Sequence, residues 1–119
     1  MKISSYRDLI VWKKSIDLVV LIYKLTENFP KEEVYGLTSQ MRRPSVSIPS
    51  NVAEGSRRGT RKDFRYFLLN SFASGAELET QIEISKKLSL CDVNKFVEID
   101  GLLNEIMKML NKLTGELNK

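Results

Sequence analysis

The sequence contains no histidine and a single cysteine, and these two shortages exclude several kinds of chemistry. Without histidine, a chain of 119 residues cannot by itself build a Ser-His-Asp triad, a Cys-His pair or a histidine-ligated zinc site. Cys91 cannot form an intrachain disulfide, which argues against a disulfide scaffold and fits a reducing compartment. Neither a Gly-x-x-x-x-Gly-Lys-Ser/Thr nor a Gly-x-Gly-x-x-Gly motif occurs. We therefore expect no enzymatic activity, no catalytic residues, no metal and no cofactor.

Proline, glycine and long apolar runs are also scarce. Three prolines and six glycines, among 42% apolar and 29% charged residues, argue against a disordered or fibrous chain. The longest apolar run, Leu18 to Tyr23, is far shorter than the ~20 residues of a membrane span. Residues 1–10 lack the pattern of a signal peptide. These features predict one domain over residues 1–119, located in the cytoplasm and without membrane contact.

Apolar residues recur with helical spacing in four segments, whereas strand patterns are weak. Helices are expected over residues 6–28, 31–54, 60–89 and 93–117. Ser5 and Thr60, each followed three residues later by an aspartate, resemble capping boxes, and Asp92 is an expected N-cap. Short connections between four such helices predict an all-α fold, an antiparallel up-down-up-down four-helix bundle.

The second segment contains two internal prolines. Pro44 and Pro49 each lack the N–H that would bond to the carbonyl four residues earlier, so we expect the helix to be kinked. Gly55 suits a left-handed position that ends this helix. Ser71 and Gly75, on the apolar face of the third segment, are small enough for a neighbouring helix to approach closely.

The first segment is apolar on two sides. One face carries Leu9, Trp12, Ile16, Val19, Val20 and Tyr23. The other face carries Val11, Leu18, Leu21, Ile22 and Leu25. Such a helix is either central in a monomer or buries one face against a partner. Because a central position is hard to arrange with only three other helices, we expect the second face to form a subunit interface.

Positive charge is concentrated in one part of the chain. The segment from Arg42 to Arg65 holds seven basic and two acidic residues, a net charge of +5, and the rest holds twelve basic and thirteen acidic residues, a net charge of −1. The seven are Arg42, Arg43, Arg57, Arg58, Arg61, Lys62 and Arg65. Cations at the start of a helix oppose its dipole, and a phosphate backbone would be attracted by both the cations and the free N–H groups. The segment predicts a nucleic-acid-binding surface, the alternative being a solvated loop.

A polar group on the second segment has two interpretations. Its members are Arg42, Arg43, Ser47, Asn51 and Glu54. They either line a polar channel shared by subunits, or serve the fold. In the second case Glu54 neutralises an arginine, and Asn51 pairs with backbone groups freed by Pro49, which we consider the better interpretation because proline leaves carbonyls in need of partners.

Five short motifs occur in order along nearly the whole chain. They are DLIVW (8–12), FPKEE (29–33), YGLTSQMRR (35–43), SIPSNVAEG (47–55) and FRYFL (64–68). Together they resemble the four-helix-bundle proteins encoded in intervening sequences of bacterial large-subunit ribosomal RNA genes, a family similar to the accessory variability determinant of diversity-generating retroelements. The resemblance implies a homopentameric ring with a basic surface and no established enzymatic activity. Pro44 departs from it, because many members have a small residue there.

Two functions follow as expectations. The first is a non-enzymatic oligomeric module that binds RNA or DNA through its phosphates, with little discrimination between sequences. The second is a protein-interaction scaffold whose basic patch meets an acidic partner, for example an accessory factor to a polymerase. The resemblance suggests a reverse transcriptase for that partner, because the retroelement relatives bind one.

Overall fold

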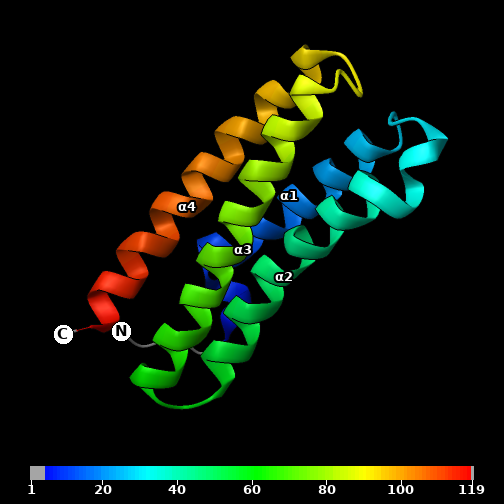
Figure 1. The fold of residues 1–119 in the computed structure, drawn as a ribbon. Coiled ribbons are helices and arrows are strands. Elements are labelled where there is room, and N and C mark those ends of the chain that lie inside the picture. The colour runs from blue at the N-terminus through cyan, green and yellow to red at the C-terminus, as the bar shows by residue number, and fades with distance from the viewer. Residues whose placement is uncertain (1–4, 119) are drawn as a thin grey trace.

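The computed structural model describes residues 5–118, and this part of the chain is helical without any strand (Figure 1). The α-helices are α1 (Ile10–Thr26), α2 (Ser39–Arg57), α3 (Arg61–Lys87) and α4 (Val97–Leu117). Short 3₁₀ helices cover Tyr6–Asp8, Lys31–Glu33 and Val93–Phe96, and a π-helical segment covers Val34–Thr38. An all-α chain with four long helices is thus confirmed. Residues 1–4 and 119 of the expected single domain lie outside the described part.

The four α-helices pack lengthwise into an elongated bundle of 44 × 23 × 20 Å (Figure 1). In Figure 1 the loop between α2 and α3 lies at the lower end, whereas the α1–α2 and α3–α4 connections lie at the upper end. Contacts join α1 to α2, α2 to α3, α3 to α4 and α4 to α1, so each helix has two neighbours around one core.

Every α-helix contributes fully buried apolar side chains to this core. Leu18 and Ile22 of α1, Ile48 of α2, Leu68 of α3 and Leu110 of α4 are all 0% exposed. Burying a side chain of this size stabilises the fold by about 1.5–3 kcal/mol relative to leaving it in water. The core therefore holds the bundle together without a disulfide.

The face of α1 predicted to form a subunit interface lies in the core instead. Buried on this face are Val11, Leu18, Ile22 and Leu25, and Leu21 is half-buried against the same core. The exposed apolar residues are Ile10, Ile16, Val20 and Tyr23, from the opposite side. The interface assignment was wrong because periodicity reveals two apolar faces without saying which of them meets the other three helices. Ser15, fully buried on the core side, satisfies its hydroxyl by donating to the Val11 carbonyl at 2.6 Å.

The α2 helix begins later and ends later than expected. Gly36, with φ −106° and ψ −121°, is not helical and separates the preceding turns from α2. Pro44 and Pro49 both lie inside α2, and both are buried. Gly55 does not end the helix in a left-handed conformation, since α2 continues to Arg57. The left-handed glycine is Gly59, with φ 87°, in the turn to α3.

Small residues bring α3 close to both of its neighbours, as predicted. Ser71 is buried and donates its hydroxyl hydrogen bond to the Ile48 carbonyl of α2 at 2.8 Å. A Cβ added at Gly75 would overlap the sulfur of Met107 in α4. Gly55 has the same role from the α2 side, because its Cβ would lie 2.7 Å from that of Phe67. The Gly55 prediction failed because a buried close approach and a left-handed turn both select glycine.

Polar side chains begin the helices at the positions read from the sequence. Thr60 accepts a hydrogen bond from the Asp63 N–H at 3.1 Å at the start of α3. Asp92 accepts one from the Asn94 N–H at 3.0 Å, and Ser5 one from the Arg7 N–H at 3.2 Å. The last two cap short 3₁₀ helices rather than α4 and α1.

Candidate nucleic-acid interface

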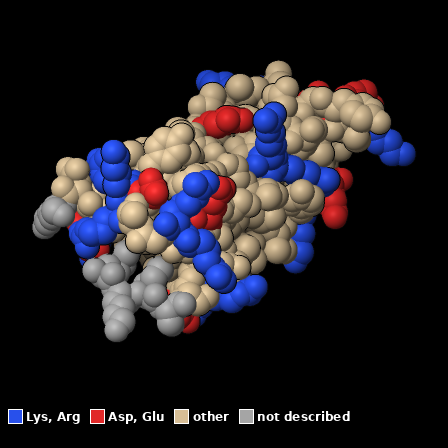
Figure 2. Space-filling view, turned by 90° about the horizontal axis from the view of Figure 1, so that it is seen from below, with Lys and Arg blue, Asp and Glu red and all other residues tan. Residues whose placement is uncertain are grey.

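Five of the seven predicted basic residues lie around the α2–α3 turn, at the lower end of the bundle. Arg57, Arg58, Arg61 and Lys62 are exposed, and Arg65 is half-buried. Figure 2 views the molecule from below, and lysine and arginine side chains protrude over this face with acidic side chains among them. We call these five residues the α2–α3 basic cluster.

Two members of the α2–α3 basic cluster bind the end of α4. Arg61 donates from Nη2 to the Glu116 carbonyl at 2.9 Å, and Arg65 donates from Nε to the Thr114 carbonyl at 3.2 Å. The last carbonyls of a helix carry the negative end of its dipole, so both contacts are charge-assisted. Arg61 and Arg65 therefore join α3 to α4, a structural role that the sequence did not indicate.

Arg58 is partly neutralised within α2. Its guanidinium lies 2.7 Å from a Glu54 carboxylate oxygen and 4.8 Å from the centre of the Phe67 ring. The predicted pairing of Glu54 with an arginine is thus confirmed. Both side chains are about half exposed, 50% and 53%, so the pair stabilises the fold by only about 0.3–0.5 kcal/mol.

Arg57 and Lys62 are the most available cations of the α2–α3 basic cluster. Neither side chain forms a hydrogen bond or an ion pair with any residue between 5 and 118. Arg57 lies 5.5 Å from the centre of the Tyr6 ring, which orients the guanidinium without neutralising it. A phosphate backbone would therefore meet Arg57 and Lys62 first.

Arg42 and Arg43 do not belong to this cluster. They are the fourth and fifth residues of α2, fifteen residues before Arg57 and Arg58, a separation of about 22 Å along a helix. Arg42 donates to the Thr26 hydroxyl at 2.9 Å and to the Tyr23 carbonyl at 3.3 Å, both at the end of α1. The structure therefore splits the seven predicted residues between two ends of the bundle.

The polar group on α2 contacts α3. Asn51 donates to the carbonyl and to the hydroxyl of Ser47, both at 2.9 Å, and Ser74 of α3 donates to the same hydroxyl at 2.9 Å. The carbonyl that Pro49 leaves without its helical donor is that of Ser45, so the predicted role of Asn51 was wrong. A channel shared by subunits stays a prediction.

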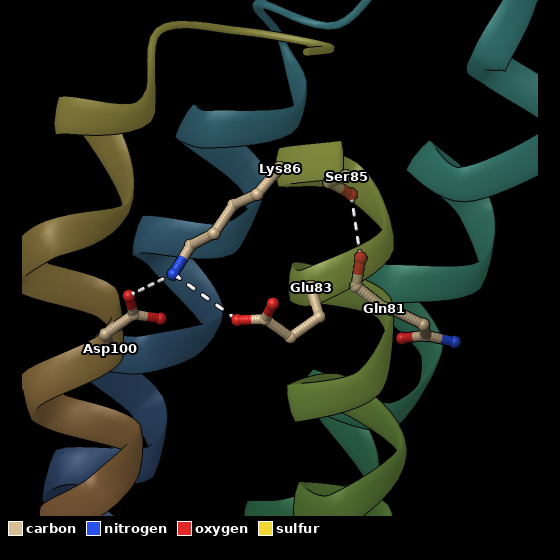
Figure 3. Close-up of polar contacts among 5 residues, drawn as sticks. All are labelled: Gln81, Glu83, Ser85, Lys86 and Asp100. Carbon is tan, nitrogen blue, oxygen red and sulfur yellow. Dashed lines mark hydrogen bonds and ion pairs between the residues drawn. The ribbon is translucent and has the colours of Figure 1, made fainter. Parts of the chain in front are cut away.

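A third polar group joins α3 to α4 near the upper end of the bundle (Figure 3). The Nζ atom of Lys86 lies 2.6 Å from a carboxylate oxygen of Asp100 in α4. It also lies 3.8 Å from a carboxylate oxygen of Glu83 in its own helix. The Gln81 side chain points to the other side of α3, and the backbone carbonyl of Gln81 accepts a hydrogen bond from the Ser85 hydroxyl at 2.9 Å (Figure 3). Because two carboxylates surround Lys86, this group does not attract an anion.

Two further features bear on chemistry. Burial raises the pKa of the Cys91 thiol above its ordinary value, which disfavours the nucleophilic thiolate. Within residues 5–118 no three histidine, cysteine or acidic side chains gather closely enough to hold a metal ion. None of the helices described is long and apolar enough to cross a membrane.

Comparison with known proteins places the chain in a family. A crystal structure of a protein of unknown function from the S23 ribosomal protein family of Bacteroides thetaiotaomicron has the same fold, with a TM-score of 0.79. The two chains are 24% identical over 88% of this chain and 98% of the other. No curated protein matches the sequence. The model of the 23S rRNA-intervening sequence protein family matches residues 7–112, and the chain belongs to that family.

Proposed function

We propose that this protein is a non-enzymatic module that binds the phosphate backbone of RNA or DNA through the α2–α3 basic cluster. The observation that carries it is the exposure of Arg57 and Lys62, which have no acidic partner among residues 5–118. Both lie where two α-helices meet in a tight turn, so one strand of nucleic acid can reach them together. Contacts limited to phosphates give affinity with little sequence preference.

The proposal includes an antiparallel course for successive helices, with α2 bent at Pro44 and Pro49. Connections at alternating ends of the bundle support the antiparallel course (Figure 1). Each proline removes one helical hydrogen bond from α2, which supports the bend. This arrangement puts the α2–α3 basic cluster at one end of the molecule.

Self-association would increase the affinity for a long polyanion. Ile16, Val20 and Tyr23, between 38% and 47% exposed, form an apolar stripe on the outer face of α1, with a spacing that repeats on one side of a helix. A second stripe on α3 consists of Tyr66, Leu69 and Phe72, 36–60% exposed. Two different apolar stripes suit a head-to-tail contact that closes into a ring, and the family resemblance suggests five subunits. Each subunit would then add its phosphate contacts to those of its neighbours.

The direct test is fluorescence anisotropy with labelled RNA and DNA over a salt series. Binding should weaken linearly on a log–log plot against salt. The double variant Arg57→Ala/Lys62→Ala should lower the slope by about 1.4–1.8 per engaged subunit, at 0.7–0.9 for each lost contact. Lys87→Ala/Lys95→Ala, which removes the same charge from the far end of α3 and its turn, is the matched control and should leave the slope unchanged. No binding at 50 mM salt, or equal slopes for both double variants, would refute nucleic-acid binding by this cluster.

A scaffold that binds an acidic protein is the second candidate. The exposed apolar stripe on α3 favours it, since exposed apolar side chains gathered on one helix face commonly mark protein contacts. Leu69→Ser/Phe72→Ser should then abolish partner binding, whereas Ile16→Ser/Val20→Ser, which removes the proposed self-association stripe on α1, should leave the partner bound. A partner that still binds the Leu69→Ser/Phe72→Ser variant would contradict the scaffold and favour the phosphate-binding function.

A further inference from the structure

A cavity of about 500 Å³ lies at the corner where α1 ends and α2 begins, at the upper end of the bundle (Figure 1). Its size falls within the range of small-molecule sites. The loop of the α2–α3 basic cluster is at the other end of α2, so the two features are separate. The residues that line the cavity carry more positive than negative charge. Lys31, Arg42 and Arg43 are basic, and Glu27 is the acidic residue among them.

Contacts with the end of α1 position Arg42 at the cavity. Its guanidinium lies 4.3 Å from the centre of the Tyr23 ring, and two of its N–H groups bind Thr26 and Tyr23. An arginine has five N–H donors, so three remain without a partner here. The end of α1 thus positions a planar cation, and a ligand would not have to order it.

Lys31 and Arg43 add unpaired positive charge. Neither side chain forms a hydrogen bond or an ion pair within residues 5–118, and both are exposed. Glu27, also exposed, is the only acidic residue among those that line the cavity. The sum of +3 and −1 leaves a net charge of +2 at this site.

Thr38 adds a hydroxyl group to the wall of the cavity. The residue is only 7% exposed and lines the cavity, yet its hydroxyl forms no hydrogen bond within residues 5–118. The oxygen itself is open to solvent, since the buried side-chain atom without a partner in residues 5–118 is Gln81 Oε1. Thr38 therefore presents a donor to the cavity that the protein itself does not use.

Apolar and aromatic side chains also line the cavity, beside Thr26 and Ser39. Among them Phe29 is 7% exposed, and Tyr23, Val34 and Val46 are 39–48% exposed. A planar heterocycle would pack on these surfaces and on the plane of Arg42, because guanidinium groups stack on flat rings. A bare inorganic anion would leave this apolar part unused.

We propose that this cavity binds a nucleoside 5′-monophosphate, with the phosphate on Arg42, Arg43, Lys31 and the Thr38 hydroxyl, and with the base against Tyr23, Val34 and Val46. The same chemistry is presented by a free nucleotide and by the phosphorylated 5′ end of a strand. Unlike the α2–α3 basic cluster, this site recognises the dianionic end of a phosphomonoester rather than the bridging phosphates of a backbone.

The test is isothermal titration calorimetry with adenosine 5′-monophosphate, using adenosine as the uncharged match. Only the monophosphate should bind. Lys31→Ala/Arg43→Ala should weaken binding about tenfold or more, since two charge-assisted contacts are lost. Thr38→Val keeps the shape of the side chain, removes the unused donor and should weaken binding about threefold. Lys108→Ala/Lys112→Ala removes equal charge from α4 and should bind like the wild type.

Three results would overturn the assignment. They are no heat with millimolar monophosphate, equal binding of adenosine, and equal weakening by the α4 control. A second arm, in the Arg57→Ala/Lys62→Ala background, compares oligonucleotides with a 5′-phosphate and a 5′-hydroxyl. A preference for the phosphate that disappears with Lys31→Ala/Arg43→Ala identifies a strand end as the source, and its absence identifies the free nucleotide. Binding of the monophosphate does not depend on the α2–α3 basic cluster, so either proposal can fail alone.

Discussion

The two faces of α1 offer the most direct test of how the bundle is assembled. Leu18 is 0% exposed in the core, whereas Val20, two residues later, is 47% exposed on the outer face. Leu18→Ala removes three buried heavy atoms and leaves a cavity, which costs about 2–5 kcal/mol of unfolding free energy. Val20→Ala removes two half-exposed methyl groups and should cost under about 1 kcal/mol.

The expected difference in unfolding free energy between Leu18→Ala and Val20→Ala is large enough to measure. A domain of this size is stable by about 5–15 kcal/mol, so Leu18→Ala removes a large fraction of that stability. At about 4 °C per kcal/mol, the midpoint of thermal unfolding should fall by about 8–20 °C. Ile22→Ala, also 0% exposed, should behave like Leu18→Ala.

Urea unfolding followed by circular dichroism at 222 nm measures both variants. The series should be repeated at several protein concentrations, because association raises the apparent stability with concentration. In Val20→Ala any loss that comes from weaker association should therefore shrink as the protein is diluted into a range where the wild type also dissociates. Equal costs for Leu18→Ala and Val20→Ala, or a smaller cost for Leu18→Ala, would refute the assignment of the faces.

Three further changes follow from single contacts. Thr60→Ala removes the cap of α3 and should cost about 1 kcal/mol in urea unfolding, and no loss would mean that the Asp63 N–H is satisfied by water. Gly75→Ala should cost about 1–3 kcal/mol through overlap with Met107, and less when Met107 is shortened to alanine, so a purely additive double variant would contradict the contact. Because burial raises the pKa of Cys91, iodoacetamide should react more slowly with the folded than with the urea-unfolded protein at pH 8. The folded state holds the thiol proton more tightly, so stability should fall as the pH rises past the ordinary thiol pKa, and Cys91→Ser should remove that fall.

Local signals in the sequence were sufficient to predict the helices and several of the residues at which they begin. Thr60 and Asp92 cap helical segments because their side-chain oxygens satisfy nearby N–H groups, which depends only on residues two or three positions away. The sequence also identified the small residues Ser71 and Gly75 as places where another helix approaches α3. The structure shows that α2 is the neighbour at Ser71 and that α4 is the neighbour at Gly75. The family motifs also span nearly the whole chain, and the family is confirmed over residues 7–112.

Long-range contacts account for what the sequence did not predict. Seven cations close in sequence number were treated as one surface, yet α2 is long enough to carry Arg42 and Arg57 to different ends. The structural contacts of Arg61 and Arg65 involve partners 49 to 55 residues away, at the end of α4. The place of Thr38 in the cavity wall cannot be read from the sequence, because it depends on how the end of α1 and the start of α2 pack together.

The sequence by itself determined that this protein is helical and which faces of its helices are apolar. It also determined that the positive charge is concentrated between Arg42 and Arg65. These properties are local or additive along the chain. The tertiary structure decided which apolar face of α1 enters the core, because both faces are apolar and only the positions of the other three helices distinguish them. It also decided which cations are free. An arginine becomes structural when the end of another helix lies within hydrogen-bonding distance, and that distance is set by how the bundle packs.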